Sequence, residues 1–201
     1  ATGLPDDNQP VDLSKRLFDE ASDWEQQVAR VHRELGIPAN YGVKHRLKTV
    51  PEAQKRVSVG LDIFNRDTEL AVAAADAWKA MRVDARQHDI ELQLVSGFRG
   101  VHYQAELIRK KLASGQSIDR ILRVTAAPGY SEHHSAEALD LTSPGITPLS
   151  QEFSMSRAYE WLKSQARLYG FRESYPNHNR HGIEWEPWHW RYRLNFDPRN
   201  R

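Results

Sequence analysis

The segment WHWRYRL, Trp188–Leu194, gives the clearest indication of how this chain folds. Two tryptophans, a tyrosine and a leucine occupy every second position, and a β-strand places such positions on one face. That face offers a large aromatic surface for a core, so His189 must point to the opposite face, together with Arg191 and Arg193. The segment therefore predicts a β-strand with one buried face and one face that carries a histidine.

Two other segments show the same alternation. Ile90–Ser96 (IELQLVS) sets two leucines against polar neighbours, and Ala138–Leu141 (ALDL) places Asp140 on the face opposite its leucines. Segments with helical patterns separate these strands. We therefore expect an α+β fold, in a single domain with a small antiparallel or mixed sheet that is flanked by helices and carries the functional site.

The remaining segments predict helices and one irregular connection. Apolar side chains recur at helical spacing and stop at glycines, which often end helices. The expected helices are Asp12–Leu35, a helix capped by Asp67, Val101–Ser114, about one turn at Ile118–Leu122, and a long helix from a cap at Ser150 to Gly170. Between Asn40 and Arg66 we expect an irregular connection with room for one short strand. Residues 1–66 should thus pack as a helical and irregular segment on a core formed by residues 67–201.

The composition narrows the class of protein. Hydrophobic residues make up 39% of the 201 residues and charged residues 27%, as in an ordinary globular chain. The formal net charge of +1 argues against a strong nucleic-acid footprint, and no apolar run is long enough for a transmembrane helix. Residues 1–10 are polar, so we expect no signal peptide in this sequence. The lack of cysteine excludes disulfides, thiolate metal sites and a cysteine nucleophile, which directs the search to the nine histidines.

Three histidine-bearing segments are candidates for a metal site. They are SEHHSAEALD (Ser131–Asp140), HNRH (His178–His181) and EPWH (Glu186–His189). Catalytic zinc typically takes three His or carboxylate ligands and leaves one position for a water whose pKa it lowers. If the strands that hold Asp140 and His189 pair, their polar faces bring both side chains together with His133 from the preceding loop. These three residues are therefore one candidate set of zinc ligands.

Hydrolysis by a water molecule also needs a general base, which can later protonate a leaving amine. Glu186 is the candidate, because it lies three residues before His189 and behind Pro187. This extended Glu-Pro-Trp-His segment differs from a helical HExxH motif, which does not occur in the chain.

Each of these residues also has a plainer interpretation. His133 and Asp140 are common residue types in loops, and His189 could be a core histidine bonded to a backbone carbonyl. Glu186 could form a salt bridge with Arg191, while the HNRH segment is expected to be exposed. On spacing alone, a zinc hydrolase and a non-enzymatic binding module are equally open.

Three blocks of sequence together indicate a family. They are SGFRG followed by Gln104, then GYSEHHSAEALDL, and then YGFRESYP with GIEWEPWHWRY, in this order over Ser96–Tyr192. The combination resembles the zinc D-alanyl-D-alanine carboxypeptidases of the VanY type, whose relatives include D-Ala-D-Ala dipeptidases and L,D-carboxypeptidases. By position, the resemblance implies that one zinc ion is held by His133, Asp140 and His189 and that Glu186 is the general base.

The resemblance also implies roles for four residues around the metal. Arg99 matches an arginine that stabilises charge on the tetrahedral intermediate, as a fixed cationic donor can. Ser131 and Gln104 match positions that contact the terminal D-residue and its carboxylate, and Tyr175 matches an aromatic residue of the pocket.

The chain departs from the family pattern at three positions, none of them an implied ligand. Ala136 stands where glycine is common, so it could narrow the loop near the metal. His134 stands where glutamine or histidine is found, and Arg193 replaces a small residue.

The expected function is removal of a C-terminal D-alanine from peptidoglycan stem peptides by a zinc-dependent D,D-carboxypeptidase. One alternative is an L,D-carboxypeptidase that acts on tetrapeptide stems. Another is a zinc-bearing module that binds cell-wall peptides without cleaving them. The expected partner is the stem peptide rather than a nucleic acid, and we expect a monomer without a transmembrane segment. Such a substrate indicates the periplasm or the cell-envelope side of the membrane, with the cytoplasm as the alternative.

Overall fold

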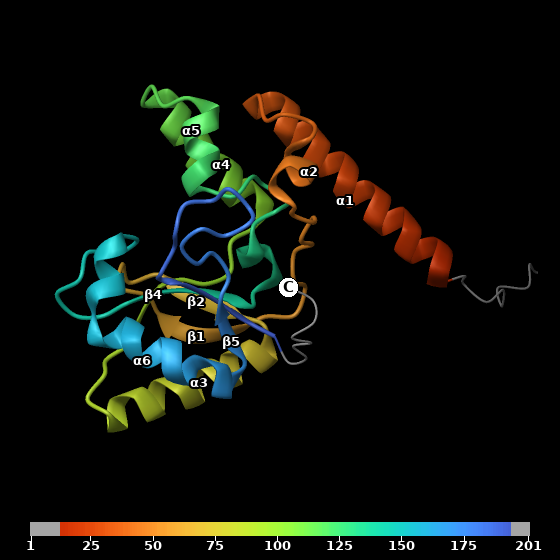
Figure 1. Cartoon of the computed structure of the whole chain (residues 1–201). Coiled ribbons are helices and arrows are strands. Elements are labelled where there is room, and N and C mark those ends of the chain that lie inside the picture. Colours follow the sequence, from red (N-terminus) through yellow and green to blue (C-terminus); the bar gives the residue numbers. More distant parts are fainter. Residues whose placement is uncertain (1–12, 194–201) are drawn as a thin grey trace, which may run out of the picture.

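A four-stranded antiparallel sheet in the order β3-β4-β6-β5 lies at the centre of the molecule (Figure 1). The structure is a computed structural model that describes residues 13–193, with side chains from residue 23 onward. The strands are β3 (Gln93–Ser96), β4 (Ala138–Thr142), β5 (Phe171–Glu173) and β6 (His189–Tyr192). In the pairing of β4 with β6, Asp140 lies directly opposite His189. The expected α+β domain with a small antiparallel sheet is confirmed.

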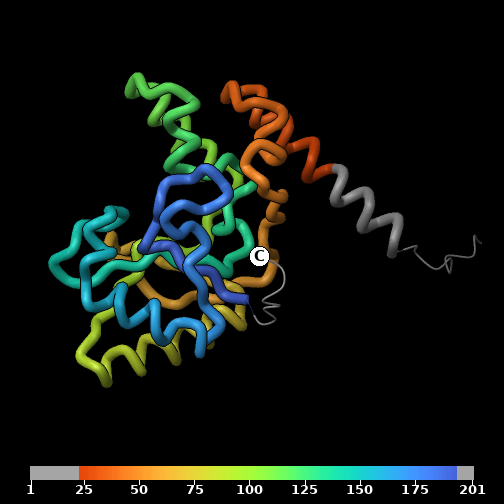
Figure 2. Tube along the Cα trace, in the orientation of Figure 1, coloured from red at the N-terminus to blue at the C-terminus, as the bar shows by residue number. Residues whose placement is uncertain are grey.

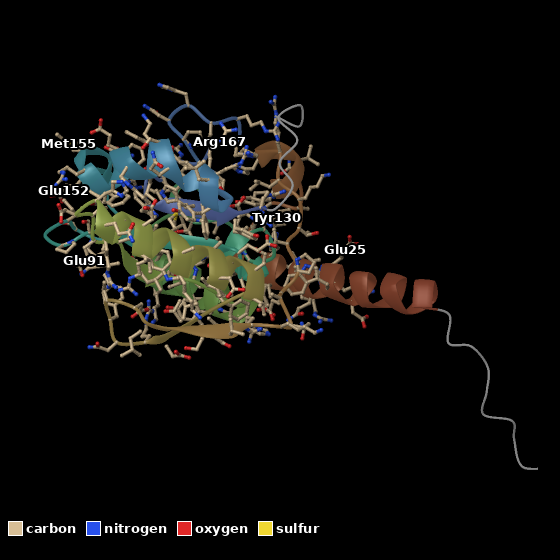
Figure 3. All side chains as sticks on the ribbon, turned by 90° about the horizontal axis from the view of Figure 1, so that it is seen from below. Glu25, Glu91, Tyr130, Glu152, Met155 and Arg167 are labelled. Atoms are coloured by element: carbon tan, nitrogen blue, oxygen red, sulfur yellow. The ribbon has the colours of Figure 1, made fainter. Side chains whose placement is uncertain are left out.

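The two faces of this sheet have different surroundings. Leu139, Leu141 and Trp190 are buried in the larger apolar core, which helices α3 (Val72–Gln87) and α6 (Arg157–Gln165) complete. The two helices lie next to one another when the molecule is seen from below (Figure 3). Because side chains alternate along a strand, Asp140 and His189 point away from this core to the other face.

Helices cover that other face at one end and form a second, smaller core. They are α1 (Leu13–Leu35), α2 (Tyr41–His45), α4 (Val101–Ala113) and α5 (Ile118–Val124). The smaller core draws Val31, Tyr41, Ile108 and Ile121 from these four helices. Gly129 is required here, because it has a φ of +86° and a Cβ atom would lie 2.4 Å from a methyl carbon of Val28 on α1.

A short hairpin precedes the first helix of the larger core. It consists of β1 (Val57–Leu61) and β2 (Asp67–Leu70), which pair in antiparallel fashion. The prediction that Asp67 caps a helix is therefore wrong. Asp67 begins β2 and accepts a hydrogen bond from the Ser58 hydroxyl at 2.5 Å, and helix α3 starts only at Val72. Cross-strand pairing decided the conformation, and the short segment carried no local signal for it.

The long helix expected from Ser150 to Gly170 is interrupted. The chain instead forms the 3₁₀ helix η2 (Gln151–Met155), helix α6, and the 3₁₀ helix η3 (Ala166–Tyr169). The cap is Ser156, whose hydroxyl accepts a hydrogen bond from the Tyr159 amide at 3.1 Å, while the Ser150 side chain caps nothing. A serine that can bond the backbone two or three residues ahead favours a helix start over a helix interior.

The last expected strand is shorter than its alternation suggested. Trp188 lies in the turn before β6 and packs partly buried against the larger core, and Leu194 falls outside the described residues. The expected orientation is nevertheless confirmed for its central part, because Trp190 is buried in that core and His189 points to the other face. Strand β5 was not anticipated, since three residues carry too little pattern to identify a strand.

Within residues 13–193, no helix combines the length and the apolar character that crossing a membrane requires. The division of the chain at residue 66 stays a prediction, and the β1–β2 hairpin spans that position.

Candidate metal centre

Three buried side chains converge on one point, on the face of the sheet that points away from the larger core. Asp140 and His189 come from paired positions on β4 and β6, and His133 comes from the 3₁₀ helix η1 (Glu132–Ser135) that leads into β4. One carboxylate oxygen of Asp140 lies 3.2 Å from Nε2 of His133 and 3.0 Å from Nδ1 of His189. Because one atom from each residue lies within 4.8 Å of the other two, the group could hold a metal ion.

Hydrogen bonds orient both imidazole rings toward this point. Nδ1 of His133 lies 2.7 Å from the Gly97 carbonyl oxygen, to which it donates, and Nε2 is left to face Asp140. Nε2 of His189 lies 2.8 Å from a Glu132 carboxylate oxygen, so its Nδ1 is left to face Asp140. Such outer hydrogen bonds fix ring orientation and tautomer in histidine metal sites. The donor set of two imidazole nitrogens and one carboxylate oxygen fits zinc.

The charges around the cluster favour a cation at its centre. Burial opposes ionisation of Asp140, but His133, His189 and Arg99 outweigh this and hold its pKa well below the usual range. Burial, together with the charge of Arg99, lowers the pKa of His133 to about 4, so this imidazole is neutral and able to bind a metal. Burial would lower the pKa of His189 as well, but hydrogen bonds to Asp140 and Glu132 raise it to about 10. The site therefore stabilises positive charge between its two carboxylates.

Glu132 orients the His189 ring, and the sequence did not predict this role. Besides contacting His189, its carboxylate accepts a hydrogen bond from the Ser174 hydroxyl at 2.6 Å and one from Arg191 at 3.3 Å. Burial opposes its ionisation, yet His189 and Arg191 lower its pKa to about 2, so it is a carboxylate at neutral pH. Its place beside His133 in the sequence was the available signal, but no spacing rule links it to His189.

Glu186 lies beside the cluster without belonging to it. Its Oε2 atom is 3.9 Å from Nδ1 of His189, and its side chain is only 14% exposed. Burial raises the pKa of Glu186 to about 7. The alternative in which Glu186 pairs with Arg191 does not hold, because the Arg191 guanidinium pairs with Glu132 and Glu137.

These groups line one cavity of about 610 Å³ between the sheet and the helices. The long connection between β5 and β6, drawn in blue, forms one wall and reaches toward α5 (Figure 2). A hydrogen bond of 2.8 Å from the Glu184 amide to the Arg123 carbonyl joins these two parts. The expected site residues that line the cavity are grouped around the cluster: Arg99, Ser131, His133, Asp140, Tyr175, Glu186 and His189.

The residues expected around the metal are held in different ways. One Arg99 nitrogen lies 3.4 Å from Asp140 and 3.2 Å from the Ser96 hydroxyl. The buried Tyr175 hydroxyl has no hydrogen-bond partner among the described residues, and burial raises its pKa well above the usual range. Gln104 is buried on α4, outside the cavity lining, and its amide nitrogen donates to the carbonyl of Ala126, which does line the cavity.

Ala136 takes the conformation that explains why glycine suits this position. Its φ of +56° lies in the left-handed region, where a side chain is disfavoured. The residue closes η1 and is not among the residues that line the cavity. The neighbouring His134 is buried and bonds the Arg99 carbonyl and the Gly129 amide, so it serves to hold loops together.

The histidines of the HNRH segment lie elsewhere. His178 is exposed, whereas Nδ1 of His181 lies 2.9 Å from the carbonyl oxygen of His45. They are not part of the group of possible metal ligands found within the described residues.

Comparisons with known proteins agree with this arrangement. The VanY D-alanyl-D-alanine carboxypeptidase family matches residues 67–195. A D-alanyl-D-alanine carboxypeptidase of Enterococcus faecalis is 27% identical over 184 residues, covering 87% of this chain and 61% of that protein. The chain spans about three fifths of the length of such curated relatives.

Solved structures show the same fold. One is the structure of the LdcB LD-carboxypeptidase, which was used to explain how that enzyme recognises peptidoglycan. It shares 30% sequence identity with this chain at a TM-score of 0.62, and the match covers 70% of this chain and 69% of that one. A Zn(II) complex of a variant of the vancomycin-resistance D,D-pentapeptidase VanY shares 24% identity at a TM-score of 0.57, covering 72% of this chain and 83% of that one. Because the family match extends over more than half of the sequence, the chain belongs to the VanY D-alanyl-D-alanine carboxypeptidase family.

Proposed function

We propose that this protein is a zinc metallopeptidase that removes the C-terminal D-alanine from peptidoglycan stem peptides, as a D,D-carboxypeptidase. One observation carries the proposal: the His133, Asp140 and His189 cluster shares a cavity with Glu186, a buried carboxyl group whose pKa is raised to about 7. Family membership and the carboxypeptidase of Enterococcus faecalis support the choice of substrate.

One zinc ion per chain would be held by Nε2 of His133, a carboxylate oxygen of Asp140 and Nδ1 of His189. When bound, zinc supplies a Lewis acid for a carbonyl oxygen and lowers the pKa of a water molecule toward neutrality. Glu132 keeps the His189 ring in the ligating orientation through its hydrogen bond to Nε2.

Glu186 carries the proton during hydrolysis. As a carboxylate it accepts a proton from the attacking water, and as a carboxylic acid it then returns that proton to the leaving amine of D-alanine. A pKa near the working pH suits a group that must both accept and donate, and burial of Glu186 raises its pKa toward that value.

The other residues bind and orient the peptide. The Arg99 guanidinium stabilises the negative charge that develops on the scissile carbonyl oxygen. Ser131, at the cavity wall, contacts the terminal D-residue, and Gln104 supports the same end of the cavity through the Ala126 carbonyl. Tyr175 offers to the peptide a buried hydroxyl that has no hydrogen-bond partner among the described residues.

An L,D-carboxypeptidase that acts on tetrapeptide stems is the second candidate. It is favoured by the similarity to the LdcB LD-carboxypeptidase, at 30% identity. The two activities share the leaving D-alanine and differ in the residue before the scissile bond. A binding module without catalysis is less well supported, because Glu186 accompanies a complete set of ligands.

The substrate class suggests a location on the cell-wall side of the cytoplasmic membrane rather than in the cytoplasm. The protein would act there as a monomer, with the stem peptide as its partner. Residues 67–201 would carry the catalytic core, and the described part of residues 1–66 shares the smaller apolar core with α4 and α5.

The test is to incubate the zinc-loaded protein with pentapeptide and tetrapeptide stems and to weigh the products. Loss of one D-alanine from the pentapeptide supports D,D-cleavage, and loss from the tetrapeptide supports the second candidate. If neither peptide loses D-alanine while the protein retains zinc, the hydrolase proposal is wrong.

Chemical changes at the end of the peptide test the mode of cleavage. A carboxypeptidase should not cleave a peptide with an amidated terminal D-alanine and should cleave an L-alanine terminus poorly, because buried polar groups would stay unpaired. Equal rates on the amidated peptide would indicate an endopeptidase instead. Arg99→Ala should depress kcat more than it raises KM if the guanidinium acts on the transition state.

A further inference from the structure

Lys111 is a cation in the cavity wall for which the proposed mechanism has no use. It lies on α4 and lines the cavity together with Leu107, one turn earlier on the same helix. Positions 107 and 111 are one turn apart and share one side of the helix, and both line the cavity that the metal cluster also lines. Lys110, the preceding residue, is exposed and does not line the cavity.

The ammonium group of Lys111 has a neutral partner. Its Nζ atom donates a hydrogen bond of 2.6 Å to the hydroxyl of the buried Thr125, which also lines the cavity. Among the described residues, no carboxylate forms an ion pair with this ammonium. Burial and the charge of Arg99 lower the pKa of Lys111, whereas the charge of Glu186 acts in the opposite sense.

The other cation of the cavity differs from Lys111 in this respect. Arg99 pairs with Asp140 at 3.4 Å, so its charge is partly compensated within the protein. Two other wall residues, Leu107 on the same helix and Val124 beside Thr125 in the sequence, are apolar and carry no charge. A half-buried ammonium without a counter-ion stabilises an anion that enters the cavity, because the charge-assisted hydrogen bond between them offsets the cost of removing both groups from water.

We propose that Lys111, held in place by Thr125, binds a carboxylate group of the peptide substrate. The inference rests on the proposed function, because it assigns this carboxylate to the peptide whose D-alanine is released. The same chemistry could come from two places on that peptide. One is the C-terminal carboxylate of D-alanine, and the other is a side-chain carboxylate of an earlier residue of the stem, as in diaminopimelate.

The test measures peptide binding to zinc-loaded Glu186→Gln protein, which should not consume the peptide. Three peptides are compared by calorimetry: N-acetyl-diaminopimelyl-D-alanyl-D-alanine, the same peptide with its terminal carboxylate amidated, and the same peptide with the side-chain carboxylate of diaminopimelate amidated. Each is titrated into Glu186→Gln alone and combined with Lys111→Met, Lys111→Arg or Lys110→Met. Zinc content and thermal unfolding confirm that every variant is folded.

Lys111→Met should weaken binding of the parent peptide by about 10- to 100-fold, the range for a lost hydrogen bond to a charged group. Lys111→Arg should restore most of the affinity, and Lys110→Met should leave it unchanged. The effect of Lys111→Met should vanish for the one analogue that lacks the contacted carboxylate, which identifies its source. An equal effect on all three peptides, or no effect on any, overturns the proposal.

Turnover of the parent peptide by the wild-type protein separates this proposal from the proposed function. If wild-type protein releases D-alanine but Lys111→Met binds all peptides as before, the carboxylate subsite is wrong and the function stands. If binding depends on Lys111 as expected but no D-alanine is released, the function is wrong and the subsite stands. Failure of every peptide to bind contradicts both.

Discussion

The molecule contains two pairs of histidines that lie close to one another, and the pairs differ in what stands between them. His133 and His189 have their ring centres 5.0 Å apart and share an oxygen of Asp140. His45 and His181 are joined instead by two reciprocal contacts of 2.8 and 2.9 Å, in which each Nδ1 meets the other residue's backbone carbonyl.

The difference shows what turns neighbouring histidines into a metal site. In the first pair, one nitrogen of each ring bonds to an outer partner and the other faces a buried carboxylate. In the second pair, the contacts tie the β5–β6 connection to α2, and neither ring bonds to a carboxylate of the described residues. Proximity alone therefore does not make ligands, whereas an oriented nitrogen next to a buried charge does.

Removal of the metal should have the largest effect. A chelator should reduce D-alanine release to background, and added zinc should restore it, because the first pair would hold the catalytic ion. The His45→Ala/His181→Ala protein serves as the control and should respond to chelator and zinc as the wild type does. Undiminished turnover after exhaustive chelation would show that the first pair holds no catalytic ion and, like the second pair, only stabilises the fold.

Loss of the Glu186 carboxyl group, which lies beside the first pair, should have the next largest effect. Glu186→Gln should keep zinc and the fold, while kcat falls by roughly 10²-fold or more, the scale of a lost acid–base group. Glu184→Gln is the matched control, since Glu184 also lines the cavity but is exposed. Near wild-type turnover of Glu186→Gln would point to another carboxylate, with Glu132 and Glu184 the candidates because both also line the cavity.

The hydrogen bond from Nε2 of His189 to Glu132 tests whether an outer partner is what makes the first pair a metal site. Glu132→Gln should weaken zinc binding by about 10- to 100-fold, since the ring loses its charged partner. Competition with a chromophoric chelator measures this affinity. Glu137→Gln is the control, because Glu137 shares the contact with Arg191 but does not touch His189. Equal zinc affinity of both variants would assign Glu132 to charge balance alone.

The second pair should matter for stability only. His181→Ala removes the contact with the His45 carbonyl and should lower the free energy of unfolding by about 1 kcal/mol, a typical value for one hydrogen bond. Urea unfolding of the metal-free protein measures the change, and exposed His178→Ala should show almost none. A loss of zinc from His181→Ala would reverse the roles of the two pairs.

The metal cluster could be anticipated from sequence because strand alternation determines it. Polar residues opposite buried leucines and tryptophans had to face the same side, so Asp140 and His189 were expected to meet once their strands paired. The second pair could not be anticipated. His45 and His181 lie 136 residues apart and meet through backbone carbonyls, and no residue pattern encodes such a contact.

The fold also contains elements that the sequence predicts and elements that it does not. The main helices and the central strands followed their periodicity, whereas short elements depended on partners distant in the sequence. Asp67 lies in a strand because β1 pairs with β2, and Ser156 rather than Ser150 starts a helix because η2 intervenes. The role of Glu132 could not be predicted, because its partner His189 lies 57 residues away on strand β6.

The zinc content of two single variants tests the central claim most directly. Elemental analysis of His189→Ala and His181→Ala, purified alike and loaded with zinc, compares one histidine from each pair. We expect His181→Ala to hold one zinc ion per chain and His189→Ala to hold almost none. Zinc that is retained in His189→Ala and lost from His181→Ala would contradict the assignment of the metal to His133, Asp140 and His189.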